Sequence, residues 1–347
     1  MTVRCGTPIE HNARIIEVSN VVKRAIGLAG GGLDSRLAFE AMRRAGYEVE
    51  GIHFETGFVR ETHRPGGSQG SLTVVDVRQR YLEEVVSAPR HGYGSGMNPC
   101  HDCRAFFLRE AEALARERGI ETLFTGDVIG QRSHDQSHRA FEIAEQDSKT
   151  TGRVVRPLSA GHLNAVEGFD PQQLPDGCGT MQGRSRRAQL ALAKAWGLDS
   201  YPTPSGRCCR LADPAYGRRL RDYLDHLDRA AGQRPEADQL PLLSLGRHFR
   251  LAWDLKLVLS RSHDEWQQMQ RLQATQATAQ PLDVGGASAL IEGPCDGDRE
   301  RRIAAVVAAH ARLDSGQRCE VLIEHGGRQS RLTSVAADTE DLEVWRI

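Results

Sequence analysis

The sequence of 347 residues contains no apolar run that approaches the length of a membrane-spanning helix. Such a span needs roughly 18 or more apolar residues, and the N-terminus also lacks the basic-then-apolar pattern of a signal peptide. We therefore expect a cytoplasmic protein with no membrane partner. Because structural disulfides are rare in that compartment, the eight cysteines are expected to be metal ligands or redox-active thiols.

The sequence contains few lysines and carries almost no net charge. Only four of the 45 basic residues are lysines, and the formal net charge is −1. A nearly neutral chain has no overall positive field that would attract nucleic acid. The arginine excess would suit phosphate recognition, but arginine is abundant throughout the chain, as a GC-rich genome would also produce, so it decides nothing by itself.

A strand, a glycine triplet and a helix start follow one another within the segment Ala25–Ser35. Inward-turned backbone N–H groups at such a turn, together with the positive end of the helix dipole, form an anion site. Glycine is needed because a side chain would keep phosphate away from the backbone and would forbid positive φ. The residues predicted to cradle phosphate are Gly30, Gly31, Gly32, Asp34 and Ser35.

This loop resembles the SGGxDS loop of the PP-loop ATP pyrophosphatases, which bind the pyrophosphate end of ATP and transfer AMP. Gly30 stands where that family usually has serine, so one hydroxyl contact to phosphate is missing. No lysine follows as in the GxxxxGK[ST] loop, and no acidic residue follows about 20 positions on as in the dinucleotide-binding turn. A glycine-rich turn that binds nothing is the alternative, and ATP binding is the better-supported interpretation.

Strands alternate with helices over the first half of the chain, which predicts an α/β fold with a doubly wound parallel sheet. Ligands bind such sheets at the carboxyl ends of the strands, where the glycine loop lies. From about residue 240 the pattern changes to a smaller α+β domain. Strands are predicted at 48–55, 72–77, 121–126, 153–158, 246–251, 256–261, 289–292, 321–324, 331–335 and 342–347, and helices at 104–119, 183–197, 213–231 and 298–313, with one more through Trp266 and Leu272.

A CxxC pair, Cys100 and Cys103, stands at the predicted start of a helix, where the dipole should lower the thiol pKa values. Cys208 and Cys209 offer one or two further thiols. Three cysteines can hold an iron–sulfur cluster with one open iron, whereas a fourth ligand would make a closed zinc site. Buried, inert thiols are the third interpretation, and it is stronger for the remaining four cysteines, which lack metal-ligand spacing.

Several blocks in a fixed order make the resemblance closer over about residues 22–225. Together they resemble PP-loop proteins related to the tRNA 4-thiouridine and 2-thiouridine synthetases. The blocks are GGGLDS at 30–35, NPCxxC at 98–103, TGDVxGQR at 125–132, RPLS at 156–159, GRSR at 183–186 and PxGxC at 204–208.

That resemblance implies a mechanism in which ATP adenylates a carbonyl oxygen of a tRNA base and sulfur then displaces AMP. Related enzymes take sulfur from a cysteine persulfide, itself derived from a cysteine desulfurase, or from sulfide on a three-cysteine 4Fe–4S cluster. Cys100, Cys103 and Cys208 match the three-cysteine arrangement as catalytic residues and metal ligands. Arg207, where relatives tend to have glycine, and the extra thiol of Cys209 leave the third ligand open.

The pattern of predicted elements and a polar linker at 232–239 also divide the chain. They predict an extension at 1–20, a PP-loop ATP-binding domain at 21–165, a helical region with the third cysteine at 166–235 and an α+β domain at 240–347. The last domain resembles the RNA-binding domain of the fibronectin-binding-like ribosome quality-control proteins. Its candidate phosphate contacts are Arg247, His248, Arg250 and Arg261, although a purely structural module is an equal alternative.

Other polar residues are expected near the nucleotide because they follow predicted strands. Asp34 is expected to help hold Mg²⁺ beside the phosphates and to cap its helix. The cluster GRSRR at 183–187 suits phosphate or the tRNA backbone, and the pair His134 and His138 is more plausibly a solvated helix face than a metal site. The expected nucleotide contacts are Thr125, Gly126, Asp127, Gln131 and Arg132, with His53 and Phe54 near the adenosine.

The leading hypothesis is therefore an ATP-dependent sulfur transferase that acts on tRNA. One rival is an ATP pyrophosphatase that activates a small metabolite for amidation or thiolation. Another is a nucleotide-binding RNA adaptor with a structural zinc site, which the replacement of serine by Gly30 mildly favours. The modified nucleotide, the sulfur donor and the oligomeric state are not indicated by the sequence.

Overall fold

The structure is a computed structural model that describes residues 22–59, 71–132, 134–198, 201, 209–227, 232–273, 277–314 and 316–347. The predicted extension at 1–20 lies outside these residues. No helix among them is long and apolar enough to cross a bilayer.

The N-terminal half is built on a parallel sheet of five strands in the order β3-β2-β1-β4-β5. Every pairing in it is parallel, and the chain runs outward from β1 first to one edge and then to the other. The predicted doubly wound α/β fold is confirmed. The strands are β1 (Lys23–Leu28), β2 (Tyr47–Glu55), β3 (Ser71–Asp76), β4 (Thr122–Phe124) and β5 (Val154–Val155).

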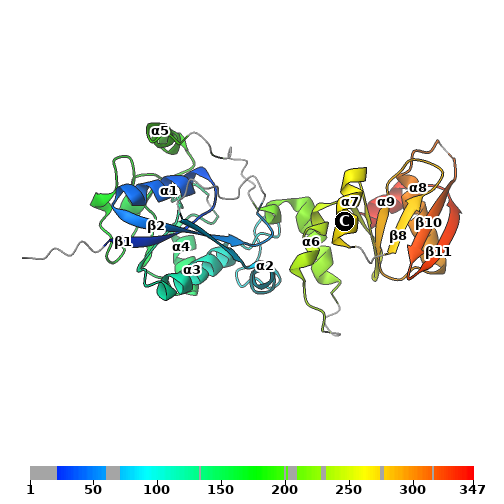
Figure 1. Cartoon of the computed structure of the whole chain (residues 1–347), viewed down its shortest axis with the longest axis horizontal. Coiled ribbons are helices and arrows are strands. Elements are labelled where there is room, and N and C mark those ends of the chain that lie inside the picture. The colour runs from blue at the N-terminus through cyan, green and yellow to red at the C-terminus, as the bar shows by residue number, and fades with distance from the viewer. Residues whose placement is uncertain are drawn as a thin grey trace, which may run out of the picture.

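Helices cover both faces of this sheet, as Figure 1 shows. On one face, α1 and α5 share a core with β1 and β2, centred on Phe39 and Phe124. On the other face, α2, the π-helical turn η3 and α3 share a core built around Phe58, Tyr81 and Phe106. The elements are α1 (Leu33–Arg44), α2 (Arg78–Tyr81), η3 (Leu82–Val86), α3 (Cys100–Glu117), α4 (His138–Ser148), which packs on α3, and α5 (Arg187–Ala195), with short 3₁₀ turns at Ala160–His162 and Pro171–Gln173.

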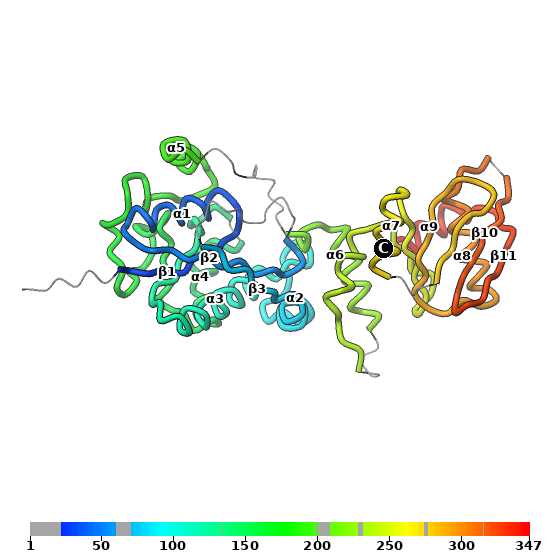
Figure 2. The backbone as a smooth tube through the Cα atoms, viewed as in Figure 1, coloured from blue at the N-terminus to red at the C-terminus, as the bar shows by residue number. Residues whose placement is uncertain are grey.

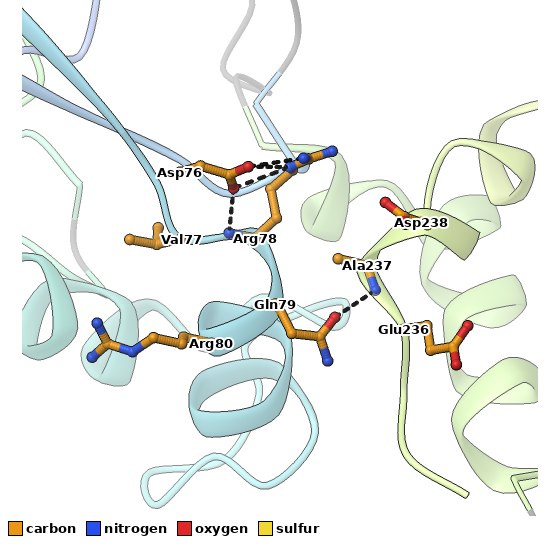
Figure 3. A pocket seen from close by; sticks show the side chains of 8 residues that line it. All are labelled: Asp76, Val77, Arg78, Gln79, Arg80, Glu236, Ala237 and Asp238. Atoms are coloured by element: carbon orange, nitrogen blue, oxygen red, sulfur yellow. Dashed lines mark hydrogen bonds and ion pairs between the residues drawn. The ribbon is translucent and has the colours of Figure 1, made fainter.

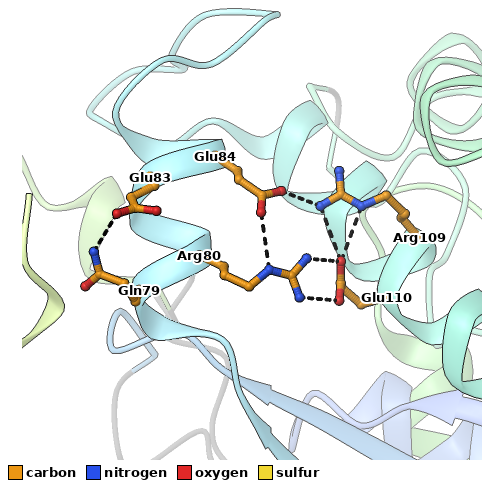
Figure 4. Close-up of polar contacts among 6 residues, drawn as sticks. All are labelled: Gln79, Arg80, Glu83, Glu84, Arg109 and Glu110. Carbon is orange, nitrogen blue, oxygen red and sulfur yellow. Dashed lines mark hydrogen bonds and ion pairs between the residues drawn. The ribbon is translucent and has the colours of Figure 1, made fainter. Parts of the chain in front are cut away.

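An ion-pair network holds α2 and η3 against α3 on the outer surface (Figure 4). Arg80 makes two hydrogen bonds to Glu110 and one to Glu84, and Arg109 bonds both of these carboxylates. The arginines are about half exposed, so the network adds orientation more than stability. It fixes the direction in which α3 presents its first turn.

Helix α6 (Pro214–Asp225) lies between the two halves of the molecule (Figures 1 and 2). Asp213 caps it by accepting from the N–H groups of Ala215 and Tyr216. The side chains of Tyr216, Leu220 and Leu224 enter the core of the N-terminal half. On another side of the helix, Arg219, Asp222 and His226 contact the C-terminal domain and the segment that leads into it.

The C-terminal domain is an antiparallel sheet of six strands in the order β11-β10-β8-β9-β7-β6, with α8 packed on one face. On the other face α7 covers β7 and β9 only. The predicted strand at 342–347 is wrong, because this stretch contains helix α9, and β8 was missed. The elements are β6 (Arg247–Ala252), β7 (Leu255–Leu259), α7 (His263–Leu272), β8 (Ala277–Pro281), β9 (Ala289–Glu292), α8 (Gly297–Ala309), β10 (Cys319–His325), β11 (Arg328–Ser334) and α9 (Thr339–Trp345), preceded by 3₁₀ turns η6 (Arg210–Ala212), η7 (Ala237–Gln239) and η8 (Leu242–Ser244).

Candidate functional site

The glycine loop joins β1 to α1 at the carboxyl edge of the sheet, beside the end of β4. Gly31 has φ +69°, a left-handed conformation that side chains with a Cβ rarely adopt. Gly32 precedes the helix in extended conformation, and no side chain caps the helix there. A Cβ built on Gly30 or Gly32 would meet nothing within 4 Å. The protein's own packing therefore does not require these two glycines, and they leave open space in front of the helix N-terminus.

Ser35 and Gly126 shape this loop. The Ser35 hydroxyl accepts from the Gly30 N–H at 3.1 Å and donates to the Leu28 carbonyl at 3.3 Å, which ties the two ends of the loop together. A Cβ on Gly126 would lie 2.6 Å from the Ser35 backbone, so the loop after β4 can approach the start of α1 only with glycine there. Both predicted residues thus lie at the glycine loop.

Asp34 is the acidic residue of this site. Its Oδ2 accepts from Gln131 Nε2 at 2.8 Å, and Arg186 Nη2 lies 3.8 Å from its Oδ1. Oδ1 is buried without a hydrogen-bond partner. Burial raises the pKa of Asp34 above its usual value, although Gln131 and Arg186 oppose the rise. A buried carboxylate oxygen with no hydrogen bond, beside the open space at Gly30 and Gly32, fits Mg²⁺, which prefers carboxylate, phosphate and water oxygens.

Helix α5 contributes two residues to this cluster that sequence reasoning did not assign to it individually. Arg186 directly precedes the helix, and Gln189 donates to Gln131 Oε1 at 3.3 Å. Gln189 is fully buried, and its Oε1 has no partner. Helix α5 packs on α1 and shares its core, so Arg186 and Gln189 lie beside the start of α1.

His53 and Phe54 were both expected near adenosine, and the structure separates them. His53 is 7% exposed, its Nδ1 lies 3.0 Å from the Ala29 carbonyl at the start of the glycine loop, and its Nε2 is buried without a partner. Phe54 instead lies in the core and stacks on Phe107 at 5.5 Å. The two side chains lie on opposite faces of the sheet because neighbouring strand residues alternate.

The loop after β4 contains a buried ion-pair cluster that links the nucleotide side to the CxxC. Arg104, one residue after Cys103, binds Asp127 at 2.5 Å and Asp135 at 3.2 Å, and Thr125 donates to Asp127 at 3.0 Å. Burial alone would raise the pKa of Asp127, but the Arg104 charge outweighs it and holds this pKa far below the usual range. The predicted Asp127 is therefore a fixed anion that positions Arg104.

Arg132, also predicted, lies at the rim of this loop. Its side chain is 57% exposed and lies 3.4 Å from Asp135. Its charge opposes the raised pKa values of both Asp34 and Cys100. The charge of Arg132 therefore acts on both the Asp34 carboxylate and the Cys100 thiol.

The two thiols of the CxxC have higher pKa values than the sequence predicted. Burial raises the pKa of Cys100, although Asn98 Nδ2 donates to its sulfur at 3.1 Å. Burial raises the pKa of Cys103 far more, and a hydrogen bond with Tyr81 only partly opposes it. The prediction that the helix N-terminus lowers these pKa values is wrong for this conformation, because desolvation exceeds the dipole effect.

Cys209 is a third thiol in this neighbourhood. Its charge contributes to the raised pKa values of Tyr81 and Cys103, and both cysteines pack on the same core. An antiparallel bridge between Val59 and Cys209 holds it there. The predicted third ligand, Cys208, lies outside the described residues.

No group of three or more His, Cys, Asp or Glu side chains in the described part of the chain could hold a metal ion. The predicted ligand set of Cys100, Cys103 and Cys208 stays a prediction, because Cys208 lies outside the described residues. The same finding covers His134, whose ring lies 5.0 Å from that of His101, and His138, the first residue of α4.

A cavity of about 450 Å³ lies away from these residues, between α2 and the segment around η7 (Figure 3). Asp76 pairs with Arg78 across its mouth, and Gln79 accepts from the Ala237 N–H at 2.9 Å. None of the predicted site residues lines it. It marks the contact between the sheet edge and the chain leading into the C-terminal domain.

Two of the four candidate phosphate contacts in the C-terminal domain have structural roles instead. His248 is 1% exposed, with Nε2 bonded to the Leu245 carbonyl at 2.8 Å. Arg250 makes two hydrogen bonds to Asp222 of α6, at 3.0 and 2.7 Å. Arg247 is partly buried, and the side chain of Arg261 is 45% exposed.

Comparison with known proteins supports both resemblances. Residues 246–346 match the family model described as NFACT protein RNA binding domain. The tRNA-specific 2-thiouridylase MnmA of Xanthobacter autotrophicus is 28% identical over 205 residues, which cover 53% of this chain and 50% of the relative. The same enzyme of a Methylobacterium species is 24% identical over 65% of this chain and 60% of the relative. The chain thus spans about half the length of the curated relatives it matches.

Two solved structures are also similar at low scores. The C-terminal part of the fibronectin/fibrinogen-binding protein from Streptococcus suis aligns with 47% of this chain and 80% of its own, with 13% identity and a TM-score of 0.26. A predicted subunit of tRNA methyltransferase from Methanocaldococcus jannaschii aligns with 50% of this chain and 76% of its own, with 16% identity and a TM-score of 0.32.

Proposed function

We propose that this protein uses ATP to adenylate a carbonyl oxygen of a tRNA base and then replaces that oxygen with sulfur. The observation that carries the proposal is the open glycine loop beside Asp34, whose buried Oδ1 accepts no hydrogen bond, with the cysteines attached to the loop after β4 through Arg104 and Asp127. The similarity to tRNA-specific 2-thiouridylases supports thiolation of tRNA as the broad activity.

In this proposal the triphosphate of ATP lies on the N–H groups of the glycine loop, in the space that Gly30 and Gly32 leave open. Asp34 Oδ1 would hold Mg²⁺, which neutralises phosphate charge. Arg186 and Arg132 face this region and would neutralise charge on the departing pyrophosphate. The base oxygen attacks the α-phosphorus, the bond to pyrophosphate breaks, and pyrophosphate leaves.

Sulfur transfer is proposed to pass through a cysteine persulfide, because Cys103 and Cys209 pack on the same core. The terminal sulfur of a persulfide on Cys103 or Cys100 attacks the activated carbon, and the C–O bond breaks so that AMP leaves with the oxygen. A second thiol then attacks the S–S bond and leaves the new sulfur on the base. The resulting disulfide needs an external dithiol reductant, and the persulfide needs a sulfur donor such as a cysteine desulfurase.

Cys209 is the second thiol that the structure offers, since it packs on the same core as Cys103. Cys208, which the family resemblance favours, is the alternative. Protonated, buried thiols also give some support to the rival reading of an RNA adaptor that binds nucleotide without sulfur chemistry.

Mass spectrometry of nucleosides tests the proposal. The protein is incubated with unmodified bulk tRNA, ATP, Mg²⁺ and a persulfide donor, and the tRNA is digested. We expect one thiolated nucleoside that requires ATP and is lost in Cys103→Ser. Absence of any new thionucleoside, despite ATP and tRNA binding, would favour the adaptor.

A further inference from the structure

We propose that three arginines at the junction between α6 and the C-terminal domain form a binding site for the phosphate backbone of RNA. This inference rests on the proposed function for its choice of RNA, and it adds a site outside the active site. The arginines come from three elements: Arg210 from η6, Arg219 from α6 and Arg261 from the turn after β7. We call them the junction arginines.

All three guanidinium groups meet on one segment, Leu243–Gly246. Arg210 Nη1 donates to the Ser244 hydroxyl. Arg219 Nη1 donates to the Leu243 carbonyl at 3.1 Å, and Arg261 Nη2 donates to the Gly246 carbonyl at 2.6 Å. Residues far apart in the sequence therefore place three positive charges along four consecutive residues.

Carboxylates compensate these charges only in part. In the part of the chain that the structure describes, neither Arg210 nor Arg219 forms an ion pair with a carboxylate. Glu265 pairs with Arg261 at 3.3 Å, and Asp213, which caps α6, is the other acidic group near Arg219. Three cations thus meet two carboxylates, and both carboxylates also accept hydrogen bonds from backbone N–H groups.

The cluster is also incompletely hydrogen-bonded. The Nε atoms of Arg210 and Arg219 are buried and have no partner. Burial lowers the pKa of Arg219, and the neighbouring charges of Arg261 and Arg218 lower it further, despite Asp213 and Glu265. An anion bound here would offset this excess of positive charge. Guanidinium groups suit phosphate because they are planar and carry several N–H donors.

The position of the cluster favours RNA. Arg261 lies within the region similar to an RNA-binding domain, and Arg210 directly follows Cys209. A backbone bound at the junction would therefore run between that domain and the thiols. The site is composite, because Arg210 and Arg219 lie outside residues 246–346.

The open face of the C-terminal sheet is a poorer candidate. Val321 and Ile323 face the core, so Glu320 and Glu324 lie on the opposite face. Arg331 of β11 lies 3.9 Å from Glu320. Carboxylates on this face would repel phosphate.

Binding of the full chain to fluorescently labelled tRNA, measured by anisotropy at several salt concentrations, tests the site. We expect Arg219→Gln combined with Arg261→Gln to weaken binding about tenfold at low salt. The dependence of log K on log salt should become less steep by roughly one to two units, since each lost phosphate contact releases fewer counterions. Arg331→Gln, which removes one positive charge from the open sheet face, should leave both quantities unchanged.

Two further variants separate binding from folding. Arg261→Gln alone removes an exposed side chain and should show part of the loss, and Arg219→Lys with Arg261→Lys should retain most of the affinity. Unfolding of every variant is followed by circular dichroism. Equal affinity and equal salt dependence in the double glutamine variant and the wild type would overturn the site and leave the proposed tRNA activity standing.

Two other results separate the alternatives. A wild-type protein that does not bind tRNA would overturn the site and the proposed tRNA substrate together. Inorganic phosphate, titrated alone by calorimetry at constant ionic strength, probes a free anion. Tight phosphate binding that the double glutamine variant loses, without any change in tRNA binding, would identify a site for free phosphate and contradict RNA binding there.

Discussion

The glycines of the phosphate loop have different physical roles, which single substitutions can separate. Gly32 has φ −76° and open space around a built Cβ, so a larger residue fits the folded protein. We expect Gly32→Val to leave the melting temperature nearly unchanged and to abolish ATP binding, because its side chain would occupy the phosphate space. Calorimetric titration with Mg-ATP measures this.

Gly30→Ser is the matched control for that variant. It restores the serine usual in PP-loop proteins at a position where a Cβ meets nothing within 4 Å. ATP affinity should stay equal or rise, by up to about tenfold if the hydroxyl makes one hydrogen bond to a charged phosphate. Loss of affinity in Gly30→Ser as large as in Gly32→Val would show that the loop is merely sensitive to substitution.

We expect Asp34 to contribute to Mg-ATP binding and to lower the stability of the folded protein. Its buried, unpartnered oxygen and raised pKa indicate that the ionised form is poorly solvated. Asp34→Asn should therefore be at least as stable as wild type, yet bind Mg-ATP at least about tenfold more weakly. Glu40→Gln on the same helix, whose carboxylate pairs with Arg44, serves as the control and should bind ATP normally. Reduced stability together with normal ATP affinity in Asp34→Asn would contradict this role.

The CxxC thiols should be unreactive in the free protein at neutral pH. An ordinary thiol, with a pKa of about 8.5, is roughly one-quarter ionised at pH 8. Since burial raises the pKa values of Cys100 and Cys103, less thiolate forms at that pH, and the alkylation rate should continue to rise above pH 9. Iodoacetamide labelling followed by peptide mass spectrometry checks this against denatured protein. If Cys100 and Cys103 of the folded protein are labelled at pH 7 as fast as in the denatured protein, the buried conformation is contradicted.

At the scale of elements, α6 couples the two halves of the molecule. Asp222 and Arg250 form its bidentate contact with β6, and both side chains are mostly buried. Arg250→Met should cost roughly 3 kcal/mol because it leaves the Asp222 carboxylate without its cation. Adding Asp222→Leu should recover much of the loss, and the double-mutant cycle is measured by denaturant unfolding. A cost for Arg250→Met that Asp222→Leu does not reduce would show that the ion pair is not the coupling contact.

Elements with local signals could be predicted from the sequence, and those that depend on distant contacts could not. The strand, glycine triplet and helix of residues 25–35 carry their own turn signals, so their position was correct, but the prediction that Asp34 caps the helix was wrong because no side chain caps it. The pairing of Arg104 with Asp127 joins residues 23 positions apart, and nothing in the local pattern indicates it. The alternation at 342–347 suggested a strand, but Asp338 precedes a helical turn there, and acidic residues in its first turn favour the helix.

The thiol pKa prediction failed for a related reason. A helix N-terminus is visible in the sequence, whereas the burial of Cys103 depends on Tyr81 and the core of η3 and α6. Desolvation by residues from other elements decided the sign of the shift. Likewise, His248 and Arg250 look like free cations in the sequence, but in the structure His248 is buried and bonded to the Leu245 carbonyl, and Arg250 pairs with Asp222 of α6.

At the scale of the whole molecule, the account assigns ATP chemistry to the N-terminal half and RNA binding to the C-terminal domain with the junction. Leu240 and Leu243 belong to the N-terminal core, so a truncation after residue 245 should preserve it. Such a truncated protein should bind Mg-ATP normally and bind tRNA much more weakly, with a reduced salt dependence. Unchanged tRNA affinity in calorimetry or anisotropy would contradict an RNA-binding role for the C-terminal domain.

The most direct test of the central claim is the product pattern from ATP labelled at the α-phosphate in one reaction and at the γ-phosphate in another, both with a persulfide donor and followed with and without tRNA. The account predicts AMP and pyrophosphate in equal amounts, formed only when tRNA is present and lost in Asp34→Asn. Formation of ADP and phosphate, or no hydrolysis by a protein that demonstrably binds both ATP and tRNA, would contradict it.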